Sequence, residues 1–262
     1  MSLRDRLAAQ IASGGPLTIA QYMTACLHDP EGGYYATRPA LGEAGDFITA
    51  PLVSQMFGEL IGLWAAECWT RLGRPAPFRL VEAGPGDGTL MSDMLRAGRA
   101  APGFLDAAGI WLVETSAPLR AAQRERLGDS VRWAADLDEV PAGAPVILVA
   151  NELLDCLPAR QWVRTPDGWA ERLVVLDAQG DLAFALGGRA PAFPSGWAEE
   201  APGDVLEASP AQAAFGETIA ARLARDGGAA LLIDYGRAEP GPCDTLQALR
   251  RHEKMHPLAC PG

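Results

Sequence analysis

The sequence has few of the residues that metal sites and disulfide frameworks require. Its five cysteines are Cys26, Cys68, Cys156, Cys243 and Cys260. They form no C-x-x-C pair, and their odd number argues against a set of structural disulfides. The histidine pair His252 and His256 lies beside Pro257 and lacks the acidic residue of a zinc-binding helix. We therefore expect reduced cysteines, a reducing compartment and no bound metal.

The sequence also lacks an excess of positive charge. It has 22 Lys and Arg against 33 Asp and Glu, which gives a net charge of −11 and a pI near 4.8. Such a surface is repelled by a phosphate backbone, so a nucleic-acid substrate is not expected. The acidic surface suits a basic protein partner that carries arginine or lysine, although the simpler explanation is solubility.

Long apolar segments are missing too. Residues 1–16 carry several charges and no apolar run of the length that a signal peptide or membrane span needs. A mitochondrial transit peptide is usually richer in Arg and Ser and poor in acids such as Asp5. We therefore predict a cytoplasmic protein that does not bind membranes, with a mitochondrial location if the source is eukaryotic.

The segment that organises the chain is a short apolar strand followed by glycines. Residues 78–81 predict a buried strand, and Gly84, Gly86 and Gly88 lead from it into a helix with apolar residues on one side. Glycine has no Cβ, so such a loop can adopt positive φ and approach a bound ligand closely. The alternative explanation is an ordinary tight turn between a strand and a helix.

The spacing of these glycines indicates the kind of ligand. A dinucleotide site has the pattern G-x-G-x-x-G and places a pyrophosphate at the helix N-terminus. Here Glu82 precedes a G-x-G-x-G pattern. This order resembles motif I of the class I S-adenosylmethionine-dependent methyltransferases. The resemblance implies that the loop passes under the methionyl part of the cofactor and that the acid lies near its ammonium group.

Two later strands are followed by acidic residues. Residues 109–113 predict a buried strand that ends at Glu114, and ligands of doubly wound sheets bind at such carboxyl ends. A carboxylate can accept both hydroxyls of a ribose, so Glu114 is the predicted ribose ligand, with a plain solvent-exposed acid as the alternative. Asp136 follows a short edge-like strand at 130–133, and the resemblance to the class I methyltransferases implies that it is the candidate for the adenine amine. Trp133 either covers the adenine or belongs to the core.

The most apolar predicted strand, residues 145–150, is followed by Asn151, Glu152 and Asp155. The transferred methyl group should lie at this carboxyl end. The amide and the two acids could receive a cationic or amine substrate, and a carboxylate can bind a guanidinium in a fork. We therefore predict that these three residues are catalytic, with Glu152 as the first choice.

Helices precede this core. Residues 3–11 and 19–27 predict two short helices, the second capped by Thr18, which form an N-terminal cap. A longer helix is predicted over 53–64. Its expected apolar face consists of Met56, Leu60, Leu63 and Trp64, with Phe57 and Ile61 beside them.

The loop at 45–51 contains the polar residues Asp46 and Thr49 and one aromatic residue, Phe47. Its composition alone predicts a turn with capping side chains.

The periodicity changes after residue 160. Three short runs separated by turns predict an antiparallel meander over 160–186, and 187–203 predict a loop. A helix at 209–225 and a fifth strand at 229–233 follow. We predict an α/β fold: a Rossmann-like class I methyltransferase sheet with helices on both faces, an N-terminal helical cap and an antiparallel β insertion after the fourth strand. The predicted segments are the cap and active-site loop (1–75), the cofactor-binding core (76–159), the insertion (160–203) and the last helix and strand (204–262).

Taken together, the motifs resemble the MidA-like family of S-adenosylmethionine-dependent methyltransferases. The matching blocks run in order across nearly the whole chain: 22–23, 28–35, 45–51, 54–59, 80–86, 151–152 with Asp155, 157–158, 233–236 and 244–247. The resemblance implies S-adenosylmethionine as cofactor and an arginine of a partner protein as methyl acceptor. Mitochondrial members of the family assist assembly of respiratory complex I.

The resemblance also assigns residues to parts of the site. Glu82 and the glycines Gly84, Gly86 and Gly88 belong to the cofactor side, and the block at 151–152 belongs to the acceptor side. In this family the loop at 45–51 is part of the active-site wall, which makes its residues Asp46, Phe47 and Thr49 pocket candidates. The sequence departs from the family at Asp87, where many members have a basic residue. The family also runs on beyond the block at 244–247, so we expect the usual last antiparallel strands to be absent and the fifth strand to leave an exposed edge.

The reaction that this reading implies is an SN2 transfer of methyl from the sulfonium to a guanidino nitrogen, with Glu152 orienting the guanidinium. Fold alone does not fix function. One alternative is an assembly or interaction protein that keeps the fold and the cofactor without turnover. Another is a methyltransferase that acts on a small molecule. The oligomeric state cannot be inferred from the sequence.

Overall fold

The computed structural model describes residues 1–37, 49–190, 201–236 and 241–262. Contacts divide the chain into two compact units. The core unit comprises residues 38–155 and 214–235, and the insertion unit comprises residues 1–37, 156–213 and 236–262. The predicted cofactor motifs all lie in the core unit.

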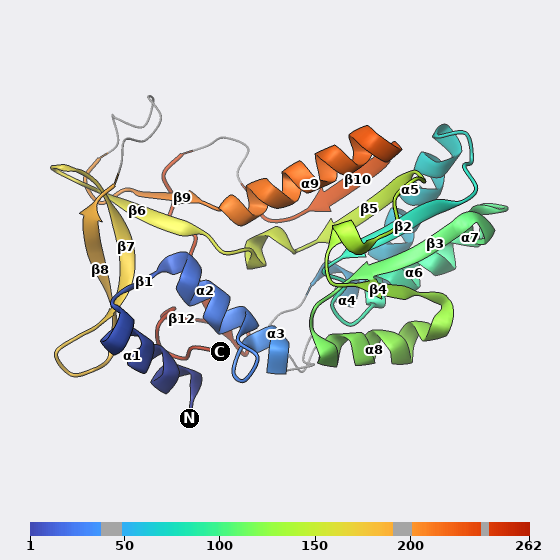
Figure 1. The fold of residues 1–262 in the computed structure, drawn as a ribbon. Coiled ribbons are helices and arrows are strands. Elements are labelled where there is room, and N and C mark those ends of the chain that lie inside the picture. Colours follow the sequence, from blue (N-terminus) through green and yellow to red (C-terminus); the bar gives the residue numbers. More distant parts are fainter. Residues whose placement is uncertain (38–48, 191–200, 237–240) are drawn as a thin grey trace. The chain divides into compact units, whose positions relative to one another are not determined.

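A parallel five-stranded sheet forms the centre of the core unit (Figure 1). Its strands are β2 (Phe78–Ala83), β3 (Ala108–Val113), β4 (Arg132–Ala134), β5 (Val146–Asn151) and β10 (Gly228–Ile233). The strand order is β10-β5-β2-β3-β4, and all the pairs are parallel. The winding direction reverses between β2 and β5, which is where ligands of doubly wound sheets bind. The predicted α/β fold class is confirmed.

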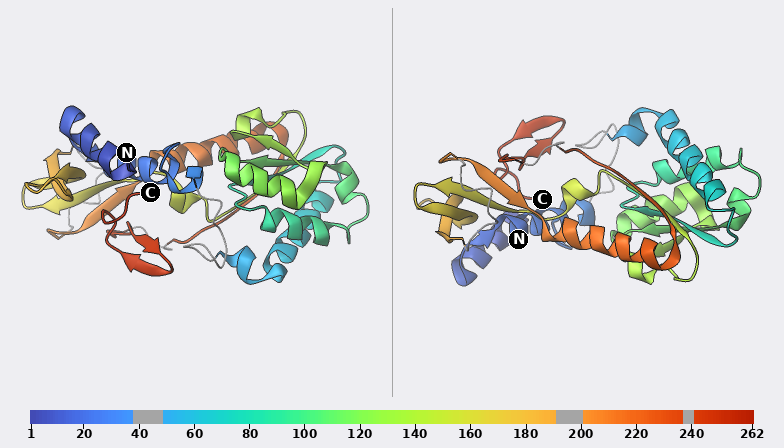
Figure 2. Two further views of the ribbon diagram at one scale, coloured as in Figure 1. Left: turned by 90° about the horizontal axis from the view of Figure 1, so that it is seen from below. Right: turned by 90° about the horizontal axis from the view of Figure 1, so that it is seen from above.

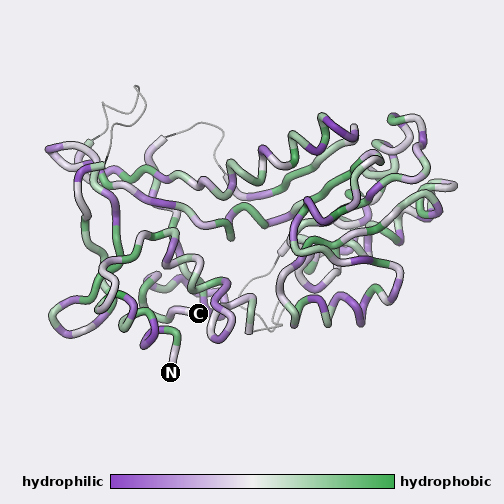
Figure 3. Tube along the Cα trace, viewed as in Figure 1, coloured by the Kyte–Doolittle hydropathy of each residue, from purple (hydrophilic) through white to green (hydrophobic). Residues whose placement is uncertain are grey.

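Helices cover both faces of this sheet (Figure 2). The helices of the core unit, including the short ones, are α4 (Ala50–Val53), α5 (Gln55–Arg71), α6 (Thr89–Gly98), α7 (Phe104–Ala107), α8 (Ala117–Leu127), η1 (Gly128–Ser130), η2 (Leu137–Glu139) and most of α9 (Pro210–Asp226). Side chains from α5 and α6 pack on the face that carries Leu80, whereas α9 packs Ile219 on the opposite face, beside Val81. Apolar residues run along the central strands, as the green stretches of Figure 3 show.

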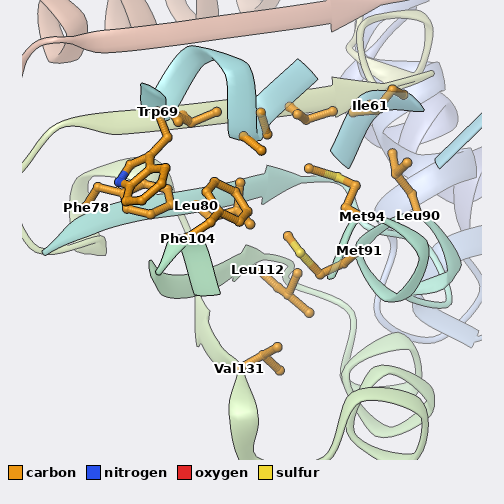
Figure 4. Packing of buried hydrophobic residues seen from close by; sticks show 14 residues of the cluster. Ile61, Trp69, Phe78, Leu80, Leu90, Met91, Met94, Phe104, Leu112 and Val131 are labelled. Atoms are coloured by element: carbon orange, nitrogen blue, oxygen red, sulfur yellow. The ribbon is translucent and has the colours of Figure 1, made fainter. Parts of the chain in front are cut away.

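The larger core cluster consists of the buried side chains between α5, α6 and the sheet face that carries Leu80, and it contains several aromatic rings. Trp69, Phe78 and Phe104 are buried and lie together in Figure 4. The ring centroids of Phe78 and Phe104 are 5.2 Å apart, and those of Trp69 and Phe104 are 5.7 Å apart in an edge-to-face arrangement. Such pairs add stabilisation beyond the burial of their area. They therefore help to hold the first residue of β2, the strand from which the glycine loop extends.

Helix α5 buries a different face from the predicted one. Met56, Leu60 and Leu63 are exposed, by 64%, 60% and 46%. The buried face is instead Gly58, Ile61, Gly62, Ala65, Ala66 and Trp69. Glycines look like helix breakers in the sequence, but here they let α5 approach α6 closely: an added Cβ at Gly62 would lie 2.6 Å from the carbonyl oxygen of Met94. The predicted apolar face was therefore wrong for Met56, Leu60 and Leu63. Ile61 is buried as expected, and Phe57 and Trp64 pack against the core.

The close approach of α5 and α6 leads to a prediction about the free energy of unfolding. Gly62→Ala is expected to lower the free energy of unfolding by about 1–3 kcal/mol, because the new methyl meets backbone atoms of Met94 that cannot rotate away. Gly216→Ala in α9 is the matched control: that helical glycine is exposed, with nothing within 4 Å of an added Cβ. It should gain up to about 1 kcal/mol from helix propensity. Urea unfolding of both variants gives the comparison, and equal effects would contradict the assigned helix contact.

The insertion unit combines the N-terminal helices with antiparallel strands. Its helices are α1 (Leu3–Gly14), α2 (Ile19–His28) and α3 (Tyr34–Thr37), and the turn η3 (Leu154–Cys156) ends in it. Its strands are β1 (Leu17–Thr18), β6 (Arg160–Thr165), β7 (Gly168–Leu176), β8 (Leu182–Arg189), β9 (Val205–Ala208), β11 (Ala248–Arg250) and β12 (Glu253–Met255). The sheet order is β1-β7-β6-β9, with β8 on β7, and β11 pairs with β12. The predicted meander is present, and β9 is an additional strand.

One core cluster joins segments of this unit that lie far apart in sequence. Leu7 and Ile11 of α1 and Tyr22 of α2 pack with Val174 of β7 and with Leu258 near the chain end. Both helices have a capping box, at Ser2 and at Thr18, as their sequences favour. The helices predicted as a separate cap therefore share a core with the β insertion. The predicted four-segment division remains a prediction about domain boundaries.

Candidate functional site

The carboxyl ends of four of the five parallel strands carry the polar residues predicted for the site. Because the strands are parallel and adjacent, the residues that follow them lie along a single edge of the sheet. Glu82 and the glycine loop lie at the end of β2, and Asn151 and Glu152 at the end of β5. Glu114 and Asp136 follow β3 and β4. The structure thus brings together, at one edge, residues that lie between positions 82 and 152 of the chain.

The glycine loop has the backbone that its sequence predicts. Gly84, Gly86 and Gly88 have φ of 67°, 54° and 84°, values that L-residues adopt only with strain. Gly88 is the N-cap of α6. Asp87, the departure from the family pattern, accepts a bond from the Thr89 N–H at 3.0 Å and forms an ion pair with Arg126 at 2.7 Å. Its charge is therefore balanced by a residue of α8.

Glu82 is a buried carboxylate with an incomplete set of partners. It is 2% exposed, and among the described residues its Oε2 atom has no hydrogen-bond donor. Burial raises the pKa of this carboxyl well above its usual range, and the charges of Asp87 and Glu114 raise it further, while a bond from the Met91 N–H opposes them. A buried acid with these surroundings favours a cationic ligand or a proton.

Asn151 faces the same side of the sheet as Glu82. Glu82 is paired with Val149, and side chains alternate along a strand, so Val149 and Asn151 share the face of Glu82. The Oδ1 atom of Asn151 is buried and likewise has no partner in the described part of the chain. Two unmatched acceptors on neighbouring strands suit a ligand with several N–H donors, such as an ammonium group.

Glu114 is held by the start of the following helix. It is 9% exposed, and its Oε1 atom accepts the N–H of Ser116 at 2.7 Å. Burial raises the pKa of its carboxyl, and bonds from the N–H groups of Ser116 and Thr115 and from Gln123 oppose that shift. These bonds fix the carboxylate at the carboxyl end of β3. The ribose role remains a prediction.

Gln123 of α8 joins three parts of the site and was missed in the sequence. It is fully buried, donates to the carbonyl of Gly86 at 2.7 Å and lies 3.4 Å from Oε2 of Glu114. Its Oε1 atom accepts the indole N–H of Trp133 at 2.8 Å. The available signal was a polar residue four positions after Leu119 on the inward face of an amphipathic helix.

The residues after β4 have local partners. Asp136 is exposed and caps η2 by accepting the N–H of Glu139 at 3.0 Å. Trp133 packs against the larger core cluster, with the Arg124 guanidinium over its ring at 4.6 Å. The structure therefore shows a packing role for Trp133 and a capping role for Asp136, and the adenine role of Asp136 remains a prediction.

Glu152 lies at the predicted acceptor side in an unusual backbone conformation. Its φ is 51°, in the left-handed region. Its Oε1 atom accepts bonds from the Ala50 N–H at 3.3 Å and from the Asn151 amide at 3.2 Å. Thr49 is the N-cap residue of α4 and directly precedes Ala50, so the structure places this pocket candidate beside Glu152. Asp46 and Phe47 lie outside the described residues.

The loop after β10, which matches the family pattern at 233–236, contributes two further candidate residues. Asp234 Oδ2 accepts the N–H of Leu154 at 2.6 Å and that of Asp155 at 3.3 Å. Tyr235 is 75% exposed, and its hydroxyl oxygen lies 3.5 Å from Oε2 of Glu152. Asp155 itself is exposed. The sequence could not reveal these contacts, because about 80 residues separate the two loops.

In the described ranges, no three His, Cys, Asp or Glu side chains are grouped as metal ligands would be. Over the same residues, no helix combines the length and the apolar character needed to cross a bilayer.

Known proteins were then compared with this chain. Residues 60–262 match the family described as "Putative S-adenosyl-L-methionine-dependent methyltransferase". The mitochondrial protein arginine methyltransferase NDUFAF7 of Danio rerio is 35% identical over all of this chain and 68% of its own length. The Homo sapiens protein of the same name is 36% identical over 98% of this chain and 64% of its own length. The chain thus spans about two thirds of these relatives.

A solved structure also resembles the chain over nearly its whole length. It is a crystal structure of a Burkholderia thailandensis protein bound to S-adenosyl-homocysteine. Its sequence is 31% identical, and the TM-score is 0.82 over 99% of this chain and 70% of that one. The fold described above is therefore shared with a protein that has been solved with this ligand.

Proposed function

Because the chain belongs to the family of S-adenosyl-L-methionine-dependent methyltransferases, we propose that it methylates arginine side chains of a partner protein. The relatives named as protein arginine methyltransferases support this acceptor. The observation that carries the proposal is the carboxylate of Glu152, which lies at the end of β5, the strand next to the glycine-loop strand β2. A carboxylate there can hold a guanidinium and concentrate electron density on one of its nitrogens.

The residues present fit the cofactor. S-adenosylmethionine, when bound, supplies an electrophilic methyl group on a sulfonium. Glu82 Oε2 and Asn151 Oδ1, the two buried acceptors without donors in the described residues, suit its ammonium group. Gly84, Gly86 and Gly88 offer backbone that can approach it closely. We assign Glu114 to the ribose and Asp136 to the adenine side. Asn151, which was predicted to be catalytic, thereby also has a proposed role in binding the cofactor.

The protonation of Glu82 gives this assignment a thermodynamic test. Burial raises the pKa of Glu82, which favours the protonated carboxyl in the free protein, whereas an ammonium bound beside it favours the ionised form. We expect cofactor binding to release a proton and the affinity to rise with pH up to the raised pKa. The test is made at about pH 6.5, where the α-amino group of the ligand is itself protonated.

Calorimetric titration with S-adenosylhomocysteine in phosphate and in Tris measures this proton, because the two buffers differ in heat of ionisation. The wild-type binding enthalpy should differ between the buffers. Glu82→Gln should bind about tenfold more weakly or less well still, with no difference between buffers. Glu125→Gln, at an exposed position of α8, should behave as wild type. A buffer-dependent enthalpy that persists in Glu82→Gln would contradict the role of this carboxyl.

The acceptor is tested by transfer of a labelled methyl group. The protein, S-adenosylmethionine carrying a tritiated methyl group and a protein extract from the same source are incubated, and hydrolysed proteins are analysed for methylarginine. Label in protein-bound methylarginine is the expected result. Label only in small molecules favours a small-molecule methyltransferase. Cofactor binding without any transfer favours the assembly or interaction protein.

The location of the chain is a separate proposal. The relatives above are mitochondrial by name, which gives no support to the predicted cytoplasmic location. We propose a mitochondrial location if the source is eukaryotic. Fractionation of the source cells, followed by detection of the protein, distinguishes the two. A role in complex I assembly is likewise a proposal taken from the family resemblance.

A further inference from the structure

Glu152 occupies a conformation that its own sequence does not favour. A glutamate with a φ of 51° is strained, and such strain persists only where neighbouring contacts determine it. The Glu152 N–H donates to the carbonyl of Ile233, the last residue of β10, at 2.8 Å. The Ala50 N–H holds the carboxylate from another side at 3.3 Å. The carboxylate is therefore aimed by the ends of two other elements.

Asp234 holds the turn that follows Glu152. Its Oδ2 atom accepts the N–H groups of Leu154 and Asp155 at 2.6 and 3.3 Å. Its Oδ1 atom accepts the N–H of Tyr235 at 2.8 Å. One side chain thus ties the loop after β5 to the loop after β10. Asp234 consequently positions both Glu152 and Tyr235.

Tyr235 presents a largely exposed ring beside this carboxylate. It is 75% exposed although it is a large aromatic residue, and its hydroxyl oxygen lies 3.5 Å from Oε2 of Glu152. The charge of Glu152, with smaller effects of burial and of Asp155, raises the pKa of the Tyr235 hydroxyl. The phenol therefore stays neutral, and its ring face remains available to a cation.

We propose that Tyr235 is an acceptor-binding residue whose ring stacks on the substrate guanidinium while Glu152 holds it in plane, so that the site selects arginine over lysine. A guanidinium is planar and can stack on an aromatic face while it forms a fork with a carboxylate. An ammonium can pair with the carboxylate but gains less from the ring. This inference rests on the proposed function and adds the residue that discriminates between acceptors.

The experiment uses the small number of tyrosines in the chain. Tyrosine labelled with ¹³C at the ring ζ carbon gives four signals, from Tyr22, Tyr34, Tyr35 and Tyr235, and the Tyr235→Phe variant identifies the last. The protein saturated with S-adenosylhomocysteine is titrated with a glycine peptide that contains one arginine, and then with its lysine counterpart. The Tyr235 signal should shift with saturation, and the lysine peptide should bind about threefold more weakly or less well still. The buried Tyr22 and Tyr34 should not respond.

Variants of Tyr235 and Asp234 distinguish a role in binding the acceptor from a purely structural role. Tyr235→Ala, at an exposed position, should weaken binding of the arginine peptide about threefold to tenfold, with unchanged affinity for S-adenosylhomocysteine. On an acceptor protein found in the transfer assay, it should raise KM more than it lowers kcat. Asp234→Ala should also weaken binding of the arginine peptide, and Asp234→Asn, which keeps an acceptor oxygen, should restore it.

The outcomes distinguish failure of the inference about Tyr235 from failure of the proposed function. If S-adenosylhomocysteine does not bind, both the proposed function and the inference fail. If it binds and the Tyr235 signal ignores the arginine peptide, or responds equally to both peptides, only the inference is overturned. If the signal responds selectively and no methyl transfer occurs, the binding role of Tyr235 stands and the enzymatic function fails.

Discussion

Glu152→Gln is expected to lower methyl transfer by about 10²–10³-fold, the range found when a group that stabilises charge in a transition state is removed. The substitution keeps the size and the acceptor oxygen that bonds the Ala50 N–H, so the loop geometry should survive. It removes the negative charge that would orient and polarise a guanidinium. Initial rates with saturating S-adenosylmethionine and an acceptor protein measure the effect.

The control for this variant is cofactor affinity. Glu152 lies on the acceptor side, so S-adenosylhomocysteine should bind to Glu152→Gln within about threefold of wild type. Glu125→Gln, an exposed acid of α8, should leave the transfer rate unchanged. Full transfer by Glu152→Gln would show that the acceptor carboxylate is elsewhere, and lost cofactor binding would place Glu152 on the cofactor side.

Gly84→Val should abolish cofactor binding, with a loss of about 100-fold or more. Gly84 has a φ of 67°, and an added Cβ would lie 2.8 Å from Cδ1 of Leu153. The valine side chain would also occupy space at the carboxyl end of β2, where the backbone must approach the ligand. In a thermal shift assay, S-adenosylhomocysteine should raise the Tm of wild type and leave that of Gly84→Val unchanged.

Gly143→Val is the matched control for backbone strain. Gly143 belongs to the same unit and has a φ of 82°, with nothing within 4 Å of an added Cβ. Both variants should lose about 1–2 kcal/mol or more of stability, because a valine is placed in the left-handed region. Gly143→Val should still be stabilised by the ligand. A ligand response in Gly84→Val equal to that of Gly143→Val would contradict a cofactor role for the glycine loop.

The parts of the fold with a strong local pattern could be predicted from the sequence. The strand at 78–81, the three glycines and the following helix were all correct in type, because apolar periodicity and the need for positive φ are local properties. Thr18 was correctly identified as the N-cap of α2. The parallel sheet followed from buried strands that alternate with helices.

Contacts between distant segments could not be predicted in this way. Met56, Leu60 and Leu63 were wrongly assigned to the buried face of α5, because Gly58 and Gly62 contribute close helix packing that a count of apolar residues does not detect. The shared core of α1, α2 and β7 joins residues about 160 positions apart, and nothing local in either segment identifies the other. Four-residue β9 was missed because so short a strand is defined by its partner β6.

The candidate site shows the same division. Glu82, the glycines and Glu152 could be identified because each follows a strand with a clear pattern. Gln123 is polar on a buried helix face, and its role becomes visible only through its bonds to the Gly86 carbonyl and to Trp133. Asp234 and Tyr235 become candidate site residues only once β10 is paired with β5. This part of the site depends on strand pairing between segments distant in sequence, so local patterns could not predict it.

Above all, we predict that the carboxyl edge of the parallel sheet binds S-adenosylmethionine. Calorimetric titration of the purified wild-type chain with S-adenosylmethionine and S-adenosylhomocysteine tests this claim most directly. We expect saturable binding of both ligands at one site per chain. A chain that unfolds cooperatively, and is therefore folded, yet binds neither ligand at concentrations up to about 1 mM would contradict the central claim.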